Sequence, residues 1–190
     1  MIKKKSFDIT KYVKGKTAVF IDAANIIYSQ QSLKWMVDFK KLGKYFTSSL
    51  EVVILNYYHA SSKNSKGQQN FFLMLADNGY TLRTKPVKYI KTDEGEVRKG
   101  NLDIEIVFDI LTNLDGFDTC IMLSGDSDFE IVVKHLRKIG KQVIVMSTKK
   151  HVSIEMIRAS NKYIDIKKLR QFWERVKKQK NTPEYKSKRG

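Results

Sequence analysis

The segment DTCIMLSGDSDFEIVVKHL, residues 118–136, decides the fold because it joins a buried strand, an acidic turn and a helix in immediate succession. The run Asp118–Ser124 is short, continuous and apolar, which indicates a strand that is covered on both faces. Apolar residues at helical spacing follow over Asp128–Ile139. Such strand–turn–helix units are typical of a parallel sheet with helices packed on each side.

The same alternation of strand and helix patterns recurs along the chain. Runs that predict further strands are Thr17–Asp22, Val52–Tyr58 and Gln142–Ser147, with weaker candidates at Tyr80–Lys88 and Tyr163–Ile166. Helical patterns cover Leu33–Ser49, Gln68–Asn78, Leu102–Leu114 and Val152–Ser160, and polar loops are expected over Ser61–Gln69 and Lys91–Asn101. The pattern predicts a three-layer α/β/α sandwich with a central, mostly parallel sheet.

Composition limits the class of protein. The chain has 190 residues, which suits one compact domain with a sizeable core. No window approaches the roughly 18 uninterrupted apolar residues of a membrane-spanning helix, so we expect a cytoplasmic protein without a membrane partner. The single cysteine, Cys120, excludes a disulfide framework and a cysteine zinc site.

Basic residues gather at the two ends of the chain. The formal net charge is +16, and six lysines against one acid occupy residues 1–16, while eleven basic and three acidic residues occupy residues 162–190. Basic ends favour attraction to a polyanion. The alternative is that they only keep the protein soluble. The expected organisation is a basic N-terminal arm (1–16), one α/β domain (17–166), a basic amphipathic C-terminal helix (167–180) and a flexible tail (181–190).

Polar and acidic residues follow two of the predicted strands. Asp22 ends the first strand and Asn25 follows it, whereas Ser124, Asp126 and Asp128 come directly after the strand at 118–124. In open parallel sheets the functional crevice lies beyond the carboxyl ends of the strands. We therefore expect these side chains to meet at one rim of the sheet.

A third acid, Asp103, begins the helix predicted over 102–114. At about 100° per residue, Asp103 falls among Ile106 and Ile110 on the apolar side, and Glu105 and Asp109 fall on the polar side. A carboxylate that faces the core is costly unless it is paired, hydrogen-bonded, protonated or bound to a cation. The position of Asp103 thus indicates that its carboxylate is stabilised by one of these interactions.

Purely structural interpretations compete for each acid. If Asn101 caps the helix, Asp103 lies in its first turn, where the helix dipole stabilises a carboxylate by about 0.3–1 kcal/mol. Ser127 and Glu130 likewise form a capping-box pattern. These alternatives explain single acids, but not their joint appearance at one rim.

Several carboxylates at one rim indicate a divalent cation, because like charges otherwise repel. Mg²⁺ takes oxygen ligands and commonly uses one or two carboxylates together with substrate phosphate oxygens. Ions of this kind assist phosphodiester cleavage by clamping the scissile phosphate and activating water. The acids therefore indicate phosphodiester chemistry, with the basic ends holding a polyanionic strand through its phosphates.

Three motifs carry a resemblance to a known family. The segments FIDAANI (20–26), RKGNLD (98–103) and LSGDSDF (123–129), followed by the strand GKQVIVM (140–146), resemble the NYN domain family, the LabA-like branch of the PIN-like nucleases. The resemblance covers about residues 17–166. It implies a PIN-like fold, a Mg²⁺ or Mn²⁺ site and RNA, or possibly DNA, as substrate.

The resemblance also assigns residues by position. Asp22, Asp103, Asp126 and Asp128 match the family's acidic metal-site residues, and Asn25 and Ser124 match its accompanying polar groups. Asp109 matches a recurrent acid, but the helical wheel places it away from Asp103, so it is left out of the ligand set. Where the family often has an aspartate before the last strand, this chain has Asn161, which supplies no charge.

The predicted function is a metal-dependent ribonuclease. Asp22, Asp103 and Asp126 would ligate the metal, and Asp128 would complete the acidic shell or orient the attacking water. The alternative is an RNA-binding or regulatory adapter with weak or no catalysis.

Three further residues are candidates for substrate contacts. Lys99 precedes Asp103 closely enough to bind a phosphate, with a solvated loop lysine as the alternative. Tyr57 and Tyr58 end a strand, where one ring could stack on a base while the other packs inside.

Overall fold

The sheet has six strands that all run parallel. The computed structural model describes residues 7–61, 65–92 and 95–176 of the chain. The strands are β1 (Thr17–Asp22), β2 (Val52–Ser61), β3 (Thr81–Pro86), β6 (Thr119–Leu123), β7 (Gln142–Ser147) and β8 (Lys162–Asp165). Their order is β3-β2-β1-β6-β7-β8, and each neighbouring pair is parallel. This confirms the predicted α/β sandwich.

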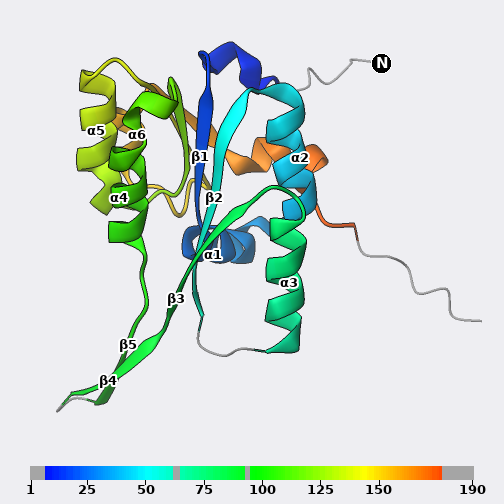
Figure 1. Cartoon of the computed structure of the whole chain (residues 1–190), viewed down its shortest axis with the longest axis vertical. Coiled ribbons are helices and arrows are strands. Elements are labelled where there is room, and N and C mark those ends of the chain that lie inside the picture. Colours follow the sequence, from blue (N-terminus) through cyan, green and yellow to red (C-terminus); the bar gives the residue numbers. More distant parts are fainter. Residues whose placement is uncertain (1–6, 62–64, 93–94, 177–190) are drawn as a thin grey trace, which may run out of the picture.

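Helices cover both faces of the sheet (Figure 1). One layer contains α1 (Ala23–Leu33), α2 (Phe39–Ser49), α3 (Lys66–Ala76) and α7 (Arg170–Trp173). The other contains α4 (Asp103–Thr112), α5 (Glu130–Lys138) and α6 (Ile154–Ala159). Successive strand residues alternate between the layers: Val19 and Ile21 pack in one core, whereas Ala18 and Phe20 pack in the other. Continuous apolar strands are the result.

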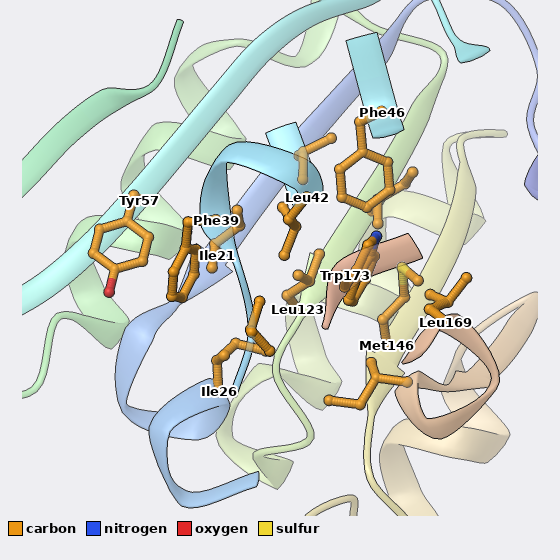
Figure 2. Packing of buried hydrophobic residues seen from close by; sticks show 14 of the residues in the cluster. Ile21, Ile26, Phe39, Leu42, Phe46, Tyr57, Leu123, Met146, Leu169 and Trp173 are labelled. Carbon is orange, nitrogen blue, oxygen red and sulfur yellow. The ribbon is translucent and has the colours of Figure 1, made fainter. Parts of the chain in front are cut away.

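The larger core includes Trp173 of α7, whose ring lies beside Phe46 of α2 (Figure 2). Trp173 is fully buried, and its ring lies 5.8 Å from that of Phe46, centroid to centroid. Leu169 and Met146 are buried in the same cluster. Because burying one such side chain stabilises a fold by about 1.5–3 kcal/mol, the C-terminal segment is part of the core.

The chain between β1 and β2 forms two helices, although one was predicted over Leu33–Ser49. Helix α1 follows β1 directly and ends at Leu33, because Lys34 adopts a left-handed conformation with φ of 61°. Helix α2 begins at Phe39, where the Asp38 side chain accepts a hydrogen bond from the Lys41 backbone N–H. The helical pattern was correct for α2 and missed α1.

A β-hairpin replaces the loop that was predicted over Lys91–Asn101. Strands β4 (Lys88–Thr92) and β5 (Gly95–Lys99) pair antiparallel and project from the body near the start of α4 (Figure 1). Gly95 has φ of 130°, a conformation that other residues rarely adopt. The hairpin carries few apolar residues, so its sequence lacks the usual strand pattern.

The described ends of the chain pack onto the body. Residues 9–12 form a 3-10 turn with Ile9 buried, and the Lys14 backbone N–H donates to Thr119 Oγ1 (2.8 Å) at the amino end of β6. A second 3-10 turn, Ile166–Leu169, leads into α7, which ends at Trp173. The basic C-terminal helix is therefore shorter than predicted, and Val176 is exposed.

Two parts of the predicted organisation, residues 1–6 of the arm and the tail 181–190, lie outside the described residues together with 177–180. Within the described ranges, no helix is both long and apolar enough to cross a membrane.

Candidate metal centre

The candidate residues lie at the point where the strand order reverses. Strand β1 pairs with β2 on one side and β6 on the other. The chain leaves β1 toward α1 in one helix layer and leaves β6 toward α5 in the other. The segments after the two strands diverge there and open a crevice at the carboxyl edge, where α/β proteins commonly bind ligands.

Asp22 is fixed by the start of α1. Its Oδ1 accepts hydrogen bonds from the backbone N–H groups of Ala24 (2.9 Å) and Asn25 (3.3 Å), so Asp22 is the N-cap of the helix. Its Oδ2 accepts a hydrogen bond from Ser124 Oγ (3.0 Å). Burial raises the pKa of the Asp22 carboxyl in spite of these donors, with the charge of Asp126 adding to the effect.

Asp126 and Asp128 are held by the turn that follows β6. Asp126 is the N-cap of the 3-10 turn Ser127–Phe129, because its Oδ1 accepts a hydrogen bond from the Asp128 N–H (3.1 Å). The Asp126 N–H in turn donates to Ser124 Oγ (3.3 Å). Ser124 thereby connects Asp22 and Asp126. The predicted capping box is absent at α5, whose N-cap is Phe129 without a side-chain bond.

Gly125 allows the acidic turn to lie against the loop after β7. A Cβ atom at this position would collide with the backbone carbonyl of His151. The Gly125 carbonyl also accepts a hydrogen bond from the Ser153 N–H (2.9 Å). The position of the acids thus depends on close backbone packing that any larger residue would disturb.

Asp103 completes the group from the first turn of α4. One ligand atom each of Asp103, Asp126 and Asp128 lies within 4.8 Å of the others. Burial raises the pKa of Asp103 to about 6, and the charges of Asp22, Asp126 and Asp128 contribute in the same direction. Asn101 Nδ2 donates a hydrogen bond to Asp103 Oδ2 (2.7 Å) and partly counteracts them. Leu102 is the N-cap residue, so the alternative in which Asn101 caps α4 is wrong, although Asp103 does lie in the first turn of the helix.

The acidic cluster has no cationic side chain as partner among the described ion pairs. Those pairs involve Asp109, Glu105, Glu130 and Glu174. Carboxylate oxygens that repel one another fit a hard divalent cation such as Mg²⁺ or Mn²⁺. Asp103, Asp126 and Asp128 could therefore hold such an ion, with Asp22 beside them.

A pocket of about 800 Å³ contains the four aspartates. Its walls include Tyr28 of α1, which is 58% exposed, and Asn101 before α4. The sequence reasoning missed both. Tyr28 lies one helical turn beyond Ala24, which also lines the pocket, and this spacing would have placed it near Asp22.

The side chain of Asn25 is hydrogen-bonded away from the acids, and the expected phosphate contact of Lys99 stays a prediction. Asn25 Nδ2 donates to the His151 carbonyl (3.3 Å), and its Oδ1 accepts from Ser147 Oγ (2.8 Å), so Asn25 ties α1 to the end of β7. Lys99 ends β5 opposite Lys88, and its side chain lies outside the described part of the molecule.

The two tyrosines of β2 are both buried. Tyr57 packs in the larger core, as one of the pair was expected to do. Tyr58 lines the pocket but is only 1% exposed, and its hydroxyl donates to Asp109 Oδ2 (2.8 Å). Neither ring is a free stacking surface.

Asp109 is buried, although the helical wheel placed it on the solvated side. It accepts hydrogen bonds from Tyr58, from Asn56 Nδ2 (3.3 Å) and from Arg83 Nε (2.9 Å). The wheel failed because α4 turns this side toward β2 and β3. Asp109 is thus a structural carboxylate with matched donors.

Asn161 also has a structural partner. Its Oδ1 accepts a hydrogen bond from the Val143 N–H (2.8 Å), and its own N–H donates to the Val143 carbonyl (2.9 Å). The amide therefore extends the pairing of the last strands, a role that needs no charge.

The parallel sheet, its two helix layers and the acidic cluster at the reversal of strand order define a PIN-like α/β/α protein. The profile of the NYN domain matches residues 16–167, and the chain belongs to the NYN domain family. It is 33% identical over 168 residues to the Low amplitude and bright protein LabA of Synechococcus elongatus, covering 86% of this chain and 90% of that protein. The crystal structure of a protein of unknown function from Vibrio parahaemolyticus RIMD 2210633 superposes with a TM-score of 0.69 and 25% identity, covering 80% and 93% of the two chains.

Proposed function

We propose that this protein is a metal-dependent ribonuclease that hydrolyses RNA phosphodiester bonds at the acidic pocket. The observation that carries the proposal is the approach of Asp103, Asp126 and Asp128 to within 4.8 Å without a cationic partner among the described ion pairs. Membership of the NYN family supports nucleic acid as the ligand. Keeping three like charges together is unfavourable unless something binds there.

Each acid has a proposed role. Asp103, Asp126 and Asp128 would hold a Mg²⁺ or Mn²⁺ ion directly or through water, with Asp22 beside them as a further ligand, and Ser124 connects Asp22 and Asp126 through its hydroxyl. When bound, such an ion polarises the scissile phosphate and lowers the pKa of water. Asp128 completes the acidic shell or accepts a hydrogen bond from the attacking water.

The phosphates need cationic contacts near the pocket. The described N-terminal residues are unsuited, because Lys14 lies at the amino ends of the strands, opposite the acids. Exposed lysines at the acidic edge come from the loop after β7 (Lys149 and Lys150) and from the hairpin (Lys88 and Lys91). We assign the backbone contacts to these elements and to Lys99, in place of the N-terminal segment.

The test is cleavage of labelled RNA and DNA oligonucleotides of equal sequence, with Mg²⁺, Mn²⁺ or a chelator. The wild type is expected to cleave RNA only with a divalent cation. Asp126→Asn should lower the rate more than about 100-fold, because even residues behind a metal ligand are worth 10- to 100-fold. Asparagine is also a good N-cap, so folding and RNA affinity should stay close to wild type.

The matched control is Asp115→Asn, the same change at an exposed acid that lines neither the acidic pocket nor the groove along α4. Equal rates for Asp126→Asn and wild type would remove the assignment of the site. Salt-dependent RNA binding by the wild type with no metal-dependent product would instead identify an RNA-binding adapter.

A further inference from the structure

Helix α4 is apolar on the side that faces away from the sheet. Ile104, Phe108 and Leu111 are 79%, 64% and 43% exposed, whereas Ile106 and Ile110 are buried against the sheet. A helix that is apolar on both sides is normally covered on both, and a contiguous exposed apolar patch commonly marks a binding surface.

The exposed side chains line a groove that adjoins the acidic pocket. The groove has a volume of about 500 Å³, and Val107, Phe108, Leu111 and Phe129 contribute to its walls. At one end it is bounded by Asn101, Asp103 and Asp128, which also line the acidic pocket. The two cavities therefore adjoin each other at these side chains, and the lining changes from charged to apolar within a few residues of α4.

We propose that this groove binds a nucleobase of the substrate and that Phe108 is the surface on which the base stacks. The proposal rests on the proposed function, because it takes the scissile phosphate to lie at the acids. Asp103 and Phe108 line the same groove, and Phe108 lies five residues further along α4, an axial rise of about 7.5 Å with a rotation of about 140° around the helix. Aromatic rings that stack on bases supply much of the affinity for single-stranded RNA.

The position of the groove beside the acids favours a nucleotide over a protein partner. A protein surface seated on the apolar groove would also cover Asp103 and Asp128 and would bury their charges without compensation. A nucleotide avoids this cost, because its phosphate shares a cation with the acids while its base covers the apolar wall. Asn101 and the carboxylate oxygens at the inner end provide polar partners for the edge of the base.

The experiment combines a protein substitution with deletion of a single base. Fluorescence anisotropy would measure binding of short RNA oligonucleotides, each with one abasic position, to Asp126→Asn protein in Mn²⁺. Phe108→Ala should weaken binding of intact RNA about tenfold, equivalent to about 1.4 kcal/mol. Phe108→Trp keeps an aromatic surface and should stay within about twofold. For one abasic position, Phe108→Ala should cause no further loss.

Leu73→Ala is the matched control, because Leu73 is equally exposed (63%) but lies on α3 and lines neither cavity. Equal affinities of Phe108→Ala and the Phe108 parent for intact RNA would overturn the proposal. So would a change of oligomeric state in sedimentation velocity with RNA affinity unchanged, which would make the groove a contact between copies.

The two proposals fail separately. If the wild type cleaves RNA and Phe108→Ala cleaves with the same KM, the nucleobase proposal is overturned and the ribonuclease stands. If the wild type yields no product but Phe108→Ala loses the base-dependent affinity, the ribonuclease is overturned and the base contact stands.

Discussion

Asp103 and Asp109 lie on the same helix, α4, in opposite electrostatic surroundings. Asp109 accepts hydrogen bonds from Tyr58, Asn56 and Arg83. Asp103 receives one hydrogen bond, from Asn101, among the described contacts and lies beside other aspartates, so its pKa is raised to about 6. The oxygens of Asp109 are satisfied by three donor side chains. Those of Asp103 receive one donor and face other negative charges.

The difference shows how a structural acid can be told from a binding acid. A buried charge with matched donors is satisfied within the protein, and nothing further needs to bind. A charge that is left among like charges keeps part of its bonding capacity for a ligand. Asp103 and Asp109 therefore respond to the same substitution in opposite ways, which gives the following predictions.

The largest effect on stability is expected at Asp109. Asp109→Asn removes the charge that Arg83 contacts and places an amide donor where Tyr58 and Asn56 donate. We expect the free energy of unfolding to fall by about 2 kcal/mol, below the 3–5 kcal/mol of a fully buried pair because the Arg83 side chain is 51% exposed. Urea unfolding monitored by circular dichroism measures this.

The control for this prediction is Glu105→Gln on the same helix. Glu105 pairs with Lys85 (2.6 Å) with both side chains partly exposed, so its loss should cost less than about 1 kcal/mol. Equal losses for the two variants would show that Asp109 is no better satisfied than a surface acid.

A smaller effect of opposite sign is expected at Asp103. Asp103→Asn removes repulsion from Asp126 and Asp128, so in the presence of a chelator the variant should be more stable than wild type. The half-exposed carboxylate is screened by solvent, which limits the gain to about 0.5–1 kcal/mol. Mn²⁺ should stabilise the wild type more than the variant, and a loss of stability in chelator would contradict the assignment.

The smallest effect is the pH dependence of the stability that Asp103→Asn gains over wild type in chelator. The Asp103 pKa is about 6 in the folded chain against 3.8 as the ordinary value, so the folded state retains a proton that the unfolded state releases between about pH 4 and 6. Protonation of Asp103 therefore contributes fully to the free energy of unfolding below about pH 4, and this contribution is lost as the pH rises through about 6.

Urea midpoints of wild type and Asp103→Asn in chelator, measured between pH 4 and 8, would test this. The difference should grow from near zero at about pH 4 to its full value above about pH 6. A difference that does not change with pH would show that the gain has another origin.

Much of the fold was predictable because strands buried on both faces are written as short apolar runs. β1 and β7 have the bounds that the sequence indicates. Helix α1 was missed because its polar Ser and Gln residues obscure the apolar spacing, and the break at Lys34 comes from a backbone conformation that carries no compositional signal. The hairpin was missed because its sequence carries few apolar residues and lacks the usual strand pattern.

The meeting of distant acids at one edge followed from the rule that parallel strands share their carboxyl ends. The proximity of Asp103, Asp126 and Asp128 is a structural finding, and their roles as ligands stay predictions. The apolar spacing within α4 could not predict which of its residues are buried. Which side faces the sheet depends on where the helix is docked, and this hid both the buried Asp109 and the exposed Phe108.

The order of the strands has a consequence for synthesis of the protein on the ribosome. Strand β1 is made first but occupies the middle of the sheet, and its neighbour β6 and the SGDSD turn emerge much later. A nascent chain therefore carries Asp22 long before the acids that face it. If the pocket cleaves RNA, the growing polypeptide cannot attack the message that encodes it until most of the chain has been translated.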